Sequence, residues 1–219
     1  MDILLIAATA AEIQPFFEYY RNSKGAQNID ILITRIGLTA ATYHLLKQLT
    51  LKRPDFVVQA GIAGCFDTNI PLGTVVIVKK EAIADQSVIE SEKLKTLFDL
   101  GLVPHDQFPF KNGWLENNHD IILNSKLKAV NAISVNEITT SKQRVKFYED
   151  AFHPVIESLE GAALHYTCLM EKIPFIQLRS ISNYIAERNK KKWDMKKSIV
   201  NLNNELINLV EKINSNAKL

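Results

Sequence analysis

The chain has 219 residues, of which 47% are hydrophobic and 23% charged, the composition of a globular protein that can bury one sizeable core. Its 26 Lys and Arg against 24 Asp and Glu leave a formal net charge of +2, too small to indicate a nucleic acid or a membrane surface as partner. This charge favours small-molecule chemistry. The chain's two cysteines, Cys65 and Cys168, lie far apart without a histidine cluster, so neither a disulfide framework nor a metal site is predicted.

The first third of the chain alternates between strand and helix patterns. An unbroken apolar run from Ile3 to Ala8 predicts a buried strand, and apolar residues at helical spacing follow from Ala10 to Tyr20. The unit repeats with a strand at 30–36, a helix at 39–49 and a strand at 54–60 whose continuous apolar character indicates burial on both faces. This alternation predicts a single-domain three-layer α/β/α fold around a central, mostly parallel mixed sheet.

The middle of the chain is less regular. A strand rich in β-branched residues is predicted at 74–85. Residues 87–118 hold prolines, glycines and aromatics with little periodicity, so we expect an irregular excursion with a short helix near 94–100, and not a second domain. A strand at 128–135 and a short helix at 141–148 resume the α/β pattern, which gives one domain over the whole chain.

The stretch 154–188 carries the strongest functional signal. Apolar residues at three- and four-residue spacing predict an amphipathic helix with Glu157 and Glu160 in its first turns, and a strand at 175–178 then leads into Asn183. Ligand crevices in α/β sheets open at the carboxyl ends of strands, so Glu160 and Asn183 are predicted to border one. The pattern alone also fits a carboxylate that stabilises a helix start and an asparagine that turns the chain.

The two ends of the chain bear on its location. From Asp194 onward, apolar residues at helical spacing predict an amphipathic helix that packs on the sheet. Near the N-terminus, Asp2 precedes a short apolar run that soon meets Glu12, which fits a buried strand and not a signal peptide. No segment approaches the ~20 apolar residues of a membrane span, and the basic run at 190–192 is expected to be solvated. We therefore expect a cytoplasmic protein.

Five short motifs follow one another along the chain. Glu12 comes after the first strand, and the glycine-bearing segments Ile36–Ala41 and Gly61–Gly64 follow it. Glu160–Ala163 then opens a helix, and Arg179–Asn183 closes a strand. Together these residues resemble the nucleoside phosphorylase/nucleosidase superfamily, especially its methylthioadenosine/S-adenosylhomocysteine nucleosidases, which carry M-E-x-x-A and R-x-I-S-D at the last two places. The resemblance implies that superfamily's fold, and a homodimer or larger homo-oligomer.

One departure narrows the resemblance. Asn183 occupies the position at which the adenosine-type nucleosidases carry Asp, and the sequence continues with Tyr184–Arg188 and Trp193. This combination resembles the futalosine hydrolases of the alternative menaquinone pathway. The resemblance implies hydrolysis of a purine nucleoside, futalosine, to hypoxanthine and dehypoxanthine futalosine, without a cofactor.

The chemistry of that reaction defines the expected roles. Cleavage of an N-glycosidic bond develops positive charge on the ribose while the purine leaves with the bonding electrons. By the resemblance, Glu160 accepts hydrogen bonds from the ribose hydroxyls and offsets the cationic ring. Glu12 orients and deprotonates the attacking water, whereas phosphorylases need basic side chains for phosphate. Arg179 supports the water or Glu12, although a structural ion pair also fits this residue.

The base is expected to meet Asn183. An Asn amide can donate to the carbonyl oxygen or to N7 of a 6-oxopurine, which suits hypoxanthine better than adenine. Ile138 falls where the family carries an aromatic that stacks on the base, so an apolar contact is expected there. The other substrate-binding residues that the resemblance implies are Gly37, Gly61, Ile62, Ala63, Gly64, Leu159 and Ser182.

Three other functions stay open at this point. A methylthioadenosine/S-adenosylhomocysteine nucleosidase fits Glu12 and Glu160 but not Asn183. A purine nucleoside phosphorylase fits Asn183 but lacks an evident phosphate-binding set. A non-catalytic purine-binding relative is compatible with the fold, because a fold does not prove an activity. The presence of Glu12, Glu160 and Arg179 together favours an enzyme.

Overall fold

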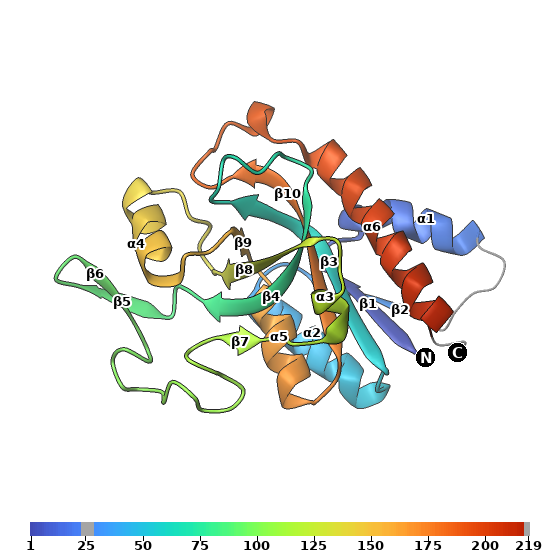
Figure 1. Ribbon diagram of the computed structural model, residues 1–219, viewed down its shortest axis with the longest axis horizontal. Helices are drawn as coiled ribbons and strands as arrows, with labels where there is room; N and C mark the ends of the chain where they lie inside the picture. Colours follow the sequence, from blue (N-terminus) through green and yellow to red (C-terminus); the bar gives the residue numbers. More distant parts are fainter. Residues whose placement is uncertain (23–28, 217–219) are drawn as a thin grey trace.

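The computed structural model describes residues 1–22 and 29–216, whose strands and helices are drawn in Figure 1. Within these ranges, none of the helices combines the length and the apolar character that crossing a membrane requires. The strands are β1 (Ile3–Ala7), β2 (Ile29–Ile33), β3 (Phe56–Cys65), β4 (Val75–Ile83), β5 (Ser87–Glu90), β6 (Lys93–Thr96), β7 (Leu115–Glu116), β8 (Lys128–Ser134), β9 (Ile156–Ser158) and β10 (Phe175–Tyr184). The helices are α1 (Gln14–Asn22), α2 (Leu38–Leu51), α3 (Asp120–Leu123), α4 (Lys142–Phe152), α5 (Gly161–Met170) and α6 (Met195–Asn216), with 3-10 turns η1 (Ala10–Glu12) and η2 (Lys190–Lys192).

Eight strands share one sheet, and part of that sheet closes into a ring. β3 pairs with β10, β10 with β4, and the ring returns to β3 through β8 and β9. β1 and β2 extend the sheet from β3, and β7 pairs with β4. Five of these pairings in the described chain are parallel and three are antiparallel. The sheet is mixed, as predicted, but its closure into a barrel-like ring does not match the predicted mostly parallel sheet exactly.

The long central strands make the closure possible. β3 and β10 have 10 residues each, so each can change partners along its length. β3 pairs with β1 from Phe56 to Gln59 and with β9 at Gly64 and Cys65. The pairing register shifts between Val78 and Lys80 in β4 and between Ile181 and Asn183 in β10. Such bulges bend a strand and increase its twist, which a closed sheet requires.

Helices cover both faces of the sheet beside β1 and β3. α1 and α6 lie against one face, and α2 and α5 lie against the other (Figure 1). β1 shows the division, because Ile3, Leu5 and Ala7 pack with α6 while Leu4 and Ile6 pack with α2 and α5. Both sets of side chains are buried, which explains why the strand reads as an unbroken apolar run.

Several segments differ from the sequence prediction. Gly61–Gly64 belongs to β3, and β10 runs on through Asn183, since ladder pairing continues past the apolar part of each strand. Glu157 lies in β9 and not in a helix, and α5 begins only after Glu160. No helix forms at 94–100, where β6 pairs with β5 as an antiparallel hairpin. Short apolar runs of this kind fit a helix turn and a brief strand equally well. The segments with which they pair in the fold therefore decide which of the two forms.

Candidate active site

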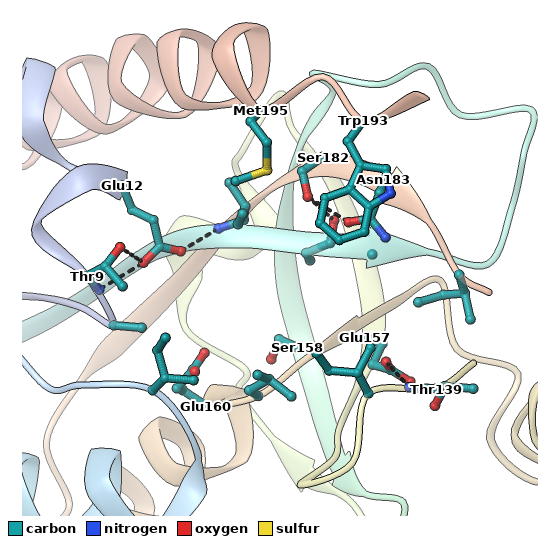
Figure 2. Close-up of a pocket in the computed structure, with 18 of the residues that line it drawn as sticks. Thr9, Glu12, Thr139, Glu157, Ser158, Glu160, Ser182, Asn183, Trp193 and Met195 are labelled. Carbon is teal, nitrogen blue, oxygen red and sulfur yellow. Dashed lines mark hydrogen bonds between the residues drawn. The ribbon is translucent and has the colours of Figure 1, made fainter. Parts of the chain in front are cut away.

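A pocket of about 350 Å³ opens at the carboxyl ends of β1, β3 and β10, where the sequence predicts a crevice. Its size suits a small organic ligand, and its walls are mainly apolar. Figure 2 shows its polar side chains, which come from elements far apart in the sequence. The pocket is lined by Ala8, Thr9, Ala11, Glu12, Ile36, Ile62–Gly64, Ile138, Thr139, Glu157–Glu160, Ser182, Asn183, Ile185–Arg188, Trp193, Met195 and Ile199.

Glu12 is fixed at one end of the pocket by three hydrogen-bond donors. Its Oε2 accepts from the backbone N–H and the hydroxyl of Thr9 at 3.0 and 2.9 Å, and its Oε1 accepts from the N–H of Ile62 at 3.0 Å (Figure 2). The short turn η1 after β1 brings Glu12 back over the strand end, where the residue is 7% exposed. A carboxylate held in one direction can orient a water molecule, as a general base must.

Glu160 faces the same space from another wall. It immediately precedes α5, and its Oε1 accepts from the N–H of Gly37 at 3.0 Å. Gly37 has a φ of 95°, in a region that glycine adopts readily. The Oε2 of Glu160 lies 3.6 Å from Nη1 of Arg179, and the two side chains are 6% and 2% exposed. Glu160 is therefore a buried carboxylate held by a backbone donor and a guanidinium.

Arg179 lies behind the pocket wall and does not line it. Its Nη2 donates to Oε1 of Gln59 at 3.1 Å, and its Nη1 donates to a backbone carbonyl of β3 at 3.3 Å. Gly61 leaves room for the guanidinium, because a Cβ there would collide with Arg179 and contact Glu12. Arg179 is thus a buried cation close to both Glu12 and Glu160, and its contacts are those of a supporting residue.

Asn183 and Ser182 face the pocket at the end away from Glu12 (Figure 2). The bulge between Ile181 and Asn183 lets these two consecutive residues line the same cavity. The hydroxyl of Ser182 donates to Oδ1 of Asn183 at 2.9 Å, and Nδ2 of Asn183 donates to the carbonyl of Tyr184 at 3.2 Å. Since Nδ2 carries two hydrogens, one N–H is left for a ligand.

Most of the predicted substrate-binding residues meet in this pocket. Gly37 and Gly61 are the two that do not line it: Gly37 binds Glu160, and Gly61 packs against Arg179. Ile138 is half exposed. The predicted residues on the pocket surface, catalytic ones included, are Glu12, Ile62, Ala63, Gly64, Ile138, Leu159, Glu160, Ser182 and Asn183.

Glu157 is a pocket residue that the sequence pattern did not assign to the site. It is 5% exposed, and its Oε1 accepts from the N–H of Thr139 at 3.1 Å. The Thr139 hydroxyl lies beside the carboxyl group without meeting hydrogen-bond geometry, and Oε2 of Glu157 has no hydrogen-bond partner among the described residues. Burial raises the pKa of Glu157, and the Thr139 contacts only partly oppose this. No local signal identifies Glu157, because its position depends on the pairing of β9 with β3.

The segment after β10 forms the mouth of the pocket. The indole N–H of Trp193 donates to the carbonyl of Glu187 at 2.9 Å, and the guanidinium of Arg188 lies 5.8 Å from the Trp193 ring centroid. The Glu187 carboxylate contacts Nζ of Lys192 at 2.6 Å and accepts from the N–H of Asn189 at 2.8 Å. Its charge is thus already balanced, whereas Arg188 makes no ion pair within the described ranges.

A second set of buried polar groups lies under the start of α5. Oε1 of Glu81 accepts from the hydroxyl of Ser134 at 2.8 Å, and that hydroxyl oxygen accepts from the N–H of Ala162 at 2.8 Å. Gly161 packs against Glu81 so closely that a Cβ would collide with Oε2. Burial raises the pKa of Glu81 to about 7 and lowers that of His165, in α5, to about 4. This cluster fixes the first turn of α5. It thereby also positions Glu160, the pocket residue that immediately precedes the helix.

The chain belongs to the phosphorylase superfamily, which matches residues 5–213. It is 28% identical over 191 residues to the 5'-methylthioadenosine/S-adenosylhomocysteine nucleosidase of Hydrogenovibrio crunogenus, across 81% of this chain and 77% of the relative. The Helicobacter pylori nucleosidase of the same name has a similar structure, with a TM-score of 0.80, 18% identity, and 97% and 98% of the two chains covered. The futalosine hydrolase of Helicobacter pylori gives a TM-score of 0.78 at 19% identity, with coverages of 97% and 98%.

These similarities confirm the predicted nucleoside phosphorylase/nucleosidase fold, an α/β fold with a central mixed sheet. They also confirm the prediction that the chain is an enzyme of the nucleosidase class. Proteins named for two different nucleoside substrates share this fold. The choice of substrate therefore has to be argued from the side chains of the pocket.

Proposed function

We propose that this protein is a futalosine hydrolase, a nucleosidase that cleaves futalosine to hypoxanthine and dehypoxanthine futalosine in menaquinone biosynthesis. The observation that carries the proposal is Asn183, whose side-chain oxygen accepts from Ser182 while one amide N–H is left for a ligand. O6 and N7 of hypoxanthine are both acceptors, so a held N–H donor suits this base. The Helicobacter pylori futalosine hydrolase shares the fold, which is compatible with the proposal but does not choose between substrates.

In this proposal the ribose lies against Glu160. As the bond between C1′ and the base nitrogen breaks, positive charge develops on the sugar, and a buried carboxylate beside it stabilises that charge. The remaining lone pairs of Glu160 can accept from the ribose hydroxyls, since the carboxylate has about four acceptor sites and its described contacts are one N–H of Gly37 and the guanidinium of Arg179.

Glu12 serves as the base that activates water. The water oxygen attacks C1′, a proton passes to the carboxylate, and the bonding electrons leave with the purine. Phosphate as nucleophile would need cationic donors near Glu12. Arg179 is close to Glu12, but it does not line the pocket, and its guanidinium is engaged by Glu160, Gln59 and a carbonyl of β3. Among the described pocket-lining residues, Arg188 carries the positive charge, and it lies in the mouth segment. This distribution of charge favours hydrolysis over phosphorolysis.

Asn183 acts on the leaving group. Electron density builds on the purine as the bond lengthens, and the amide N–H stabilises it by donating to O6 or N7. A buried donor left without an acceptor costs about 1–3 kcal/mol, so a base without an acceptor opposite the Asn183 N–H is disfavoured at this place. The same contact therefore contributes to both rate and base preference.

A second candidate is a methylthioadenosine/S-adenosylhomocysteine nucleosidase. It is favoured by the curated relatives that the chain matches, which carry that name. Glu12 and Glu160 fit it equally well, and the apolar side chains of Ile36, Met195 and Ile199 in the pocket suit a methylthio group.

Product chromatography separates the candidates. The enzyme is incubated with futalosine, inosine and methylthioadenosine, each with and without phosphate. The proposal expects hypoxanthine from futalosine at a rate independent of phosphate. Adenine release from methylthioadenosine at a higher rate would support the second candidate, and phosphate-dependent turnover would identify a phosphorylase.

Asn183→Asp tests the residue on which the assignment rests. Wild-type enzyme should cleave futalosine at least ~10-fold more efficiently than its 6-amino analogue, since one good hydrogen bond contributes about 1.4 kcal/mol. The variant should shift toward the 6-amino compound, because a protonated carboxyl group donates to N7 while its carbonyl accepts from the amino group. The measurement is the ratio of kcat/KM for the two substrates. A ratio that the substitution leaves unchanged would show that Asn183 does not read the base.

A further inference from the structure

Glu81 is a fully buried carboxyl group that the proposed mechanism does not use. It lies in β4, is 0% exposed, and does not line the pocket. Its Oε1 accepts from the hydroxyl of Ser134 at 2.8 Å, whereas its Oε2 meets no partner at hydrogen-bond geometry among the described residues. An ionised carboxylate is costly at such depth, so the protonation state of Glu81 has to fit the groups around it.

The neighbours of Glu81 form a row of hydrogen-bonding groups that ends at a backbone carbonyl. The amide of Gln177 lies beside the Glu81 carboxyl group and beside the His165 ring, and a Cβ at Gly161 would collide with both Glu81 and Gln177. At the far end, Nδ1 of His165 lies 2.9 Å from the carbonyl oxygen of Leu115. Nε2 of His165 and both polar atoms of the Gln177 amide meet no hydrogen-bond geometry within the described ranges. Their pairing therefore follows from which groups can donate and which can only accept.

The carbonyl of Leu115 sets the direction of the whole row. A carbonyl oxygen only accepts, so Nδ1 of His165 carries a hydrogen and Nε2 of the neutral ring is an acceptor. The Gln177 amide then turns its NH2 group toward His165 and its oxygen toward Glu81. Since an amide oxygen cannot donate, the Glu81 oxygen that meets it has to carry a proton. Glu81 is a neutral carboxylic acid in this arrangement.

The reverse orientation of the Gln177 amide requires two buried charges. With its NH2 group toward Glu81, its oxygen would face Nε2 of His165, and two acceptors would meet unless His165 were protonated. Burial lowers the pKa of His165 to about 4 and raises that of Glu81 to about 7. Desolvation therefore favours the neutral form of both groups, which is the first arrangement.

Two routes couple Glu81 to the pocket. The Ser134 hydroxyl that donates to Glu81 accepts from the N–H of Ala162 at 2.8 Å, in the first turn of the helix that Glu160 precedes. The charge of Arg179 lowers the pKa of Glu81 and the charge of Glu160 raises it, so both lie close enough to respond to its ionisation. The titratable groups around Glu81 are Arg179 of β10, His165 of α5 and Glu160 before α5, while β8 and β7 contribute Ser134 and Leu115.

We propose that Glu81 is a positioning residue whose proton keeps Arg179 paired with Glu160. With Glu81 neutral, one buried guanidinium serves two carboxylates, Glu12 and Glu160. Loss of the proton adds a third carboxylate to the same guanidinium and sets it against the Gln177 oxygen. The first turn of α5 then loses its support, Glu160 moves with it, and cleavage slows. This role rests on the proposed function of Glu160 and not on which nucleoside is the substrate.

The pH dependence of kcat/KM tests the role of the proton. With whichever of futalosine and methylthioadenosine is cleaved faster, wild-type kcat/KM should fall about 10-fold from about pH 6 to about pH 8, because a group with a pKa of about 7 ionises in this range. Glu81→Gln keeps the shape of the side chain and gives the Gln177 oxygen a permanent donor, so its kcat/KM should change less than ~2-fold. Glu149→Gln, at an exposed position of α4, should follow wild type. An equal decline in wild type and Glu81→Gln, or no decline in wild type, would overturn the proposal.

Infrared difference spectroscopy reads the proton without any substrate. A protonated carboxyl group has a carbonyl stretching band that a carboxylate lacks, and wild-type protein should lose one such band as pH rises through 7. The band should be missing in Glu81→Gln. It should persist in Glu157→Gln, the control for the other carboxyl group whose pKa burial raises. If Glu81→Gln does not fold, the wild-type spectrum decides, because absence of the band refutes a neutral Glu81.

The two proposals fail separately. Preference for methylthioadenosine together with a flat profile in Glu81→Gln would retain the role of Glu81 and refute the proposed substrate. Preference for futalosine together with identical profiles in both proteins would retain the substrate and refute the role of Glu81.

Discussion

Glu12 and Glu160 are held in different ways, and the difference matches their proposed roles. Glu12 accepts three hydrogen bonds, which fix the direction of its carboxylate. Glu160 accepts one backbone hydrogen bond, and its ion-pair distance of 3.6 Å to Arg179 leaves lone pairs unused. A general base needs a fixed direction, whereas a residue that binds a sugar needs free acceptors.

Glu160→Gln should lower kcat by at least ~10²-fold, because the transition state loses a negative charge beside its sugar cation. The amide keeps the size of the side chain and can still accept from Gly37, so folding should be little affected. Steady-state kinetics measure kcat. Thermal unfolding of the variant provides the control for folding, and a titration with hypoxanthine provides the control for ligand binding. A near wild-type rate would remove Glu160 from the mechanism.

Glu81 makes stability depend on pH in a defined direction. Folding raises its pKa from 4.5 to about 7, so the folded protein keeps a proton that the unfolded chain releases in that window, and stability falls as pH rises through it. His165 acts oppositely between about pH 4 and 6.5, because the folded state stays neutral where the unfolded chain binds a proton. The two effects oppose each other wherever the windows overlap.

Glu81→Gln should therefore gain stability relative to wild type as pH rises from 5 to 8, by on the order of 2–3 kcal/mol. Denaturant unfolding of both proteins at the two pH values measures this difference. Glu149→Gln, at an exposed position of α4, is the matched control and should show no such trend. A variant that tracks wild type at both pH values would contradict the raised pKa of Glu81.

At the scale of elements, the segment that follows β10 sets the charge at the pocket mouth. Glu187 is balanced by Lys192, and the contact with Lys192 lowers its pKa, so its neighbour Arg188 supplies a net positive charge beside the Trp193 ring. The charges deeper in the pocket come from carboxylates, among them Glu160, which in the proposed mechanism stabilises the sugar cation. The proposed substrate has the complementary polarity, since its substituent at the 5′ side carries a carboxylate.

Arg188→Gln should raise KM for futalosine about 2- to 5-fold, because an exposed ion pair contributes about 0.2–1 kcal/mol. KM for inosine, which has no carboxylate, should stay unchanged. Lys191→Gln removes a nearby exposed charge that does not line the pocket and serves as the control. Equal effects of both variants on both substrates would show only a general influence of charge.

Local patterns predicted most elements but not all of their partners. The apolar runs at 3–8 and 175–178 marked real strands, and the helical spacing after Glu160 marked α5. β9 was missed because three residues before a helix carry too little periodicity to separate strand from helix. The hairpin of β5 and β6 was missed for the same reason, since each strand has only 4 residues.

At the scale of the whole molecule, the candidate site depends on contacts between distant parts of the sequence. Motif resemblance pointed to Glu12, Glu160 and Asn183, which now lie around one pocket. Glu157 and Gly64 are 93 positions apart in the sequence. Only the pairing of β9 with β3 makes them neighbours. Ring closure is likewise a property of many pairings together, so the mixed sheet could not be read from any single segment.

The ring of strands also limits association between copies of the chain through exposed sheet edges. Exposed sheet edges invite strand addition and aggregation, and a closed ring has no such edge. In the larger sheet, as far as the structure describes it, unpaired edges remain at β2 and at the two-residue β7. β2 carries Asp30, whose carboxylate contacts Nζ of Lys52 at 2.7 Å, and charged side chains of this kind discourage edge pairing. The ring that frames the pocket therefore also protects the folded chain against β-sheet polymerisation.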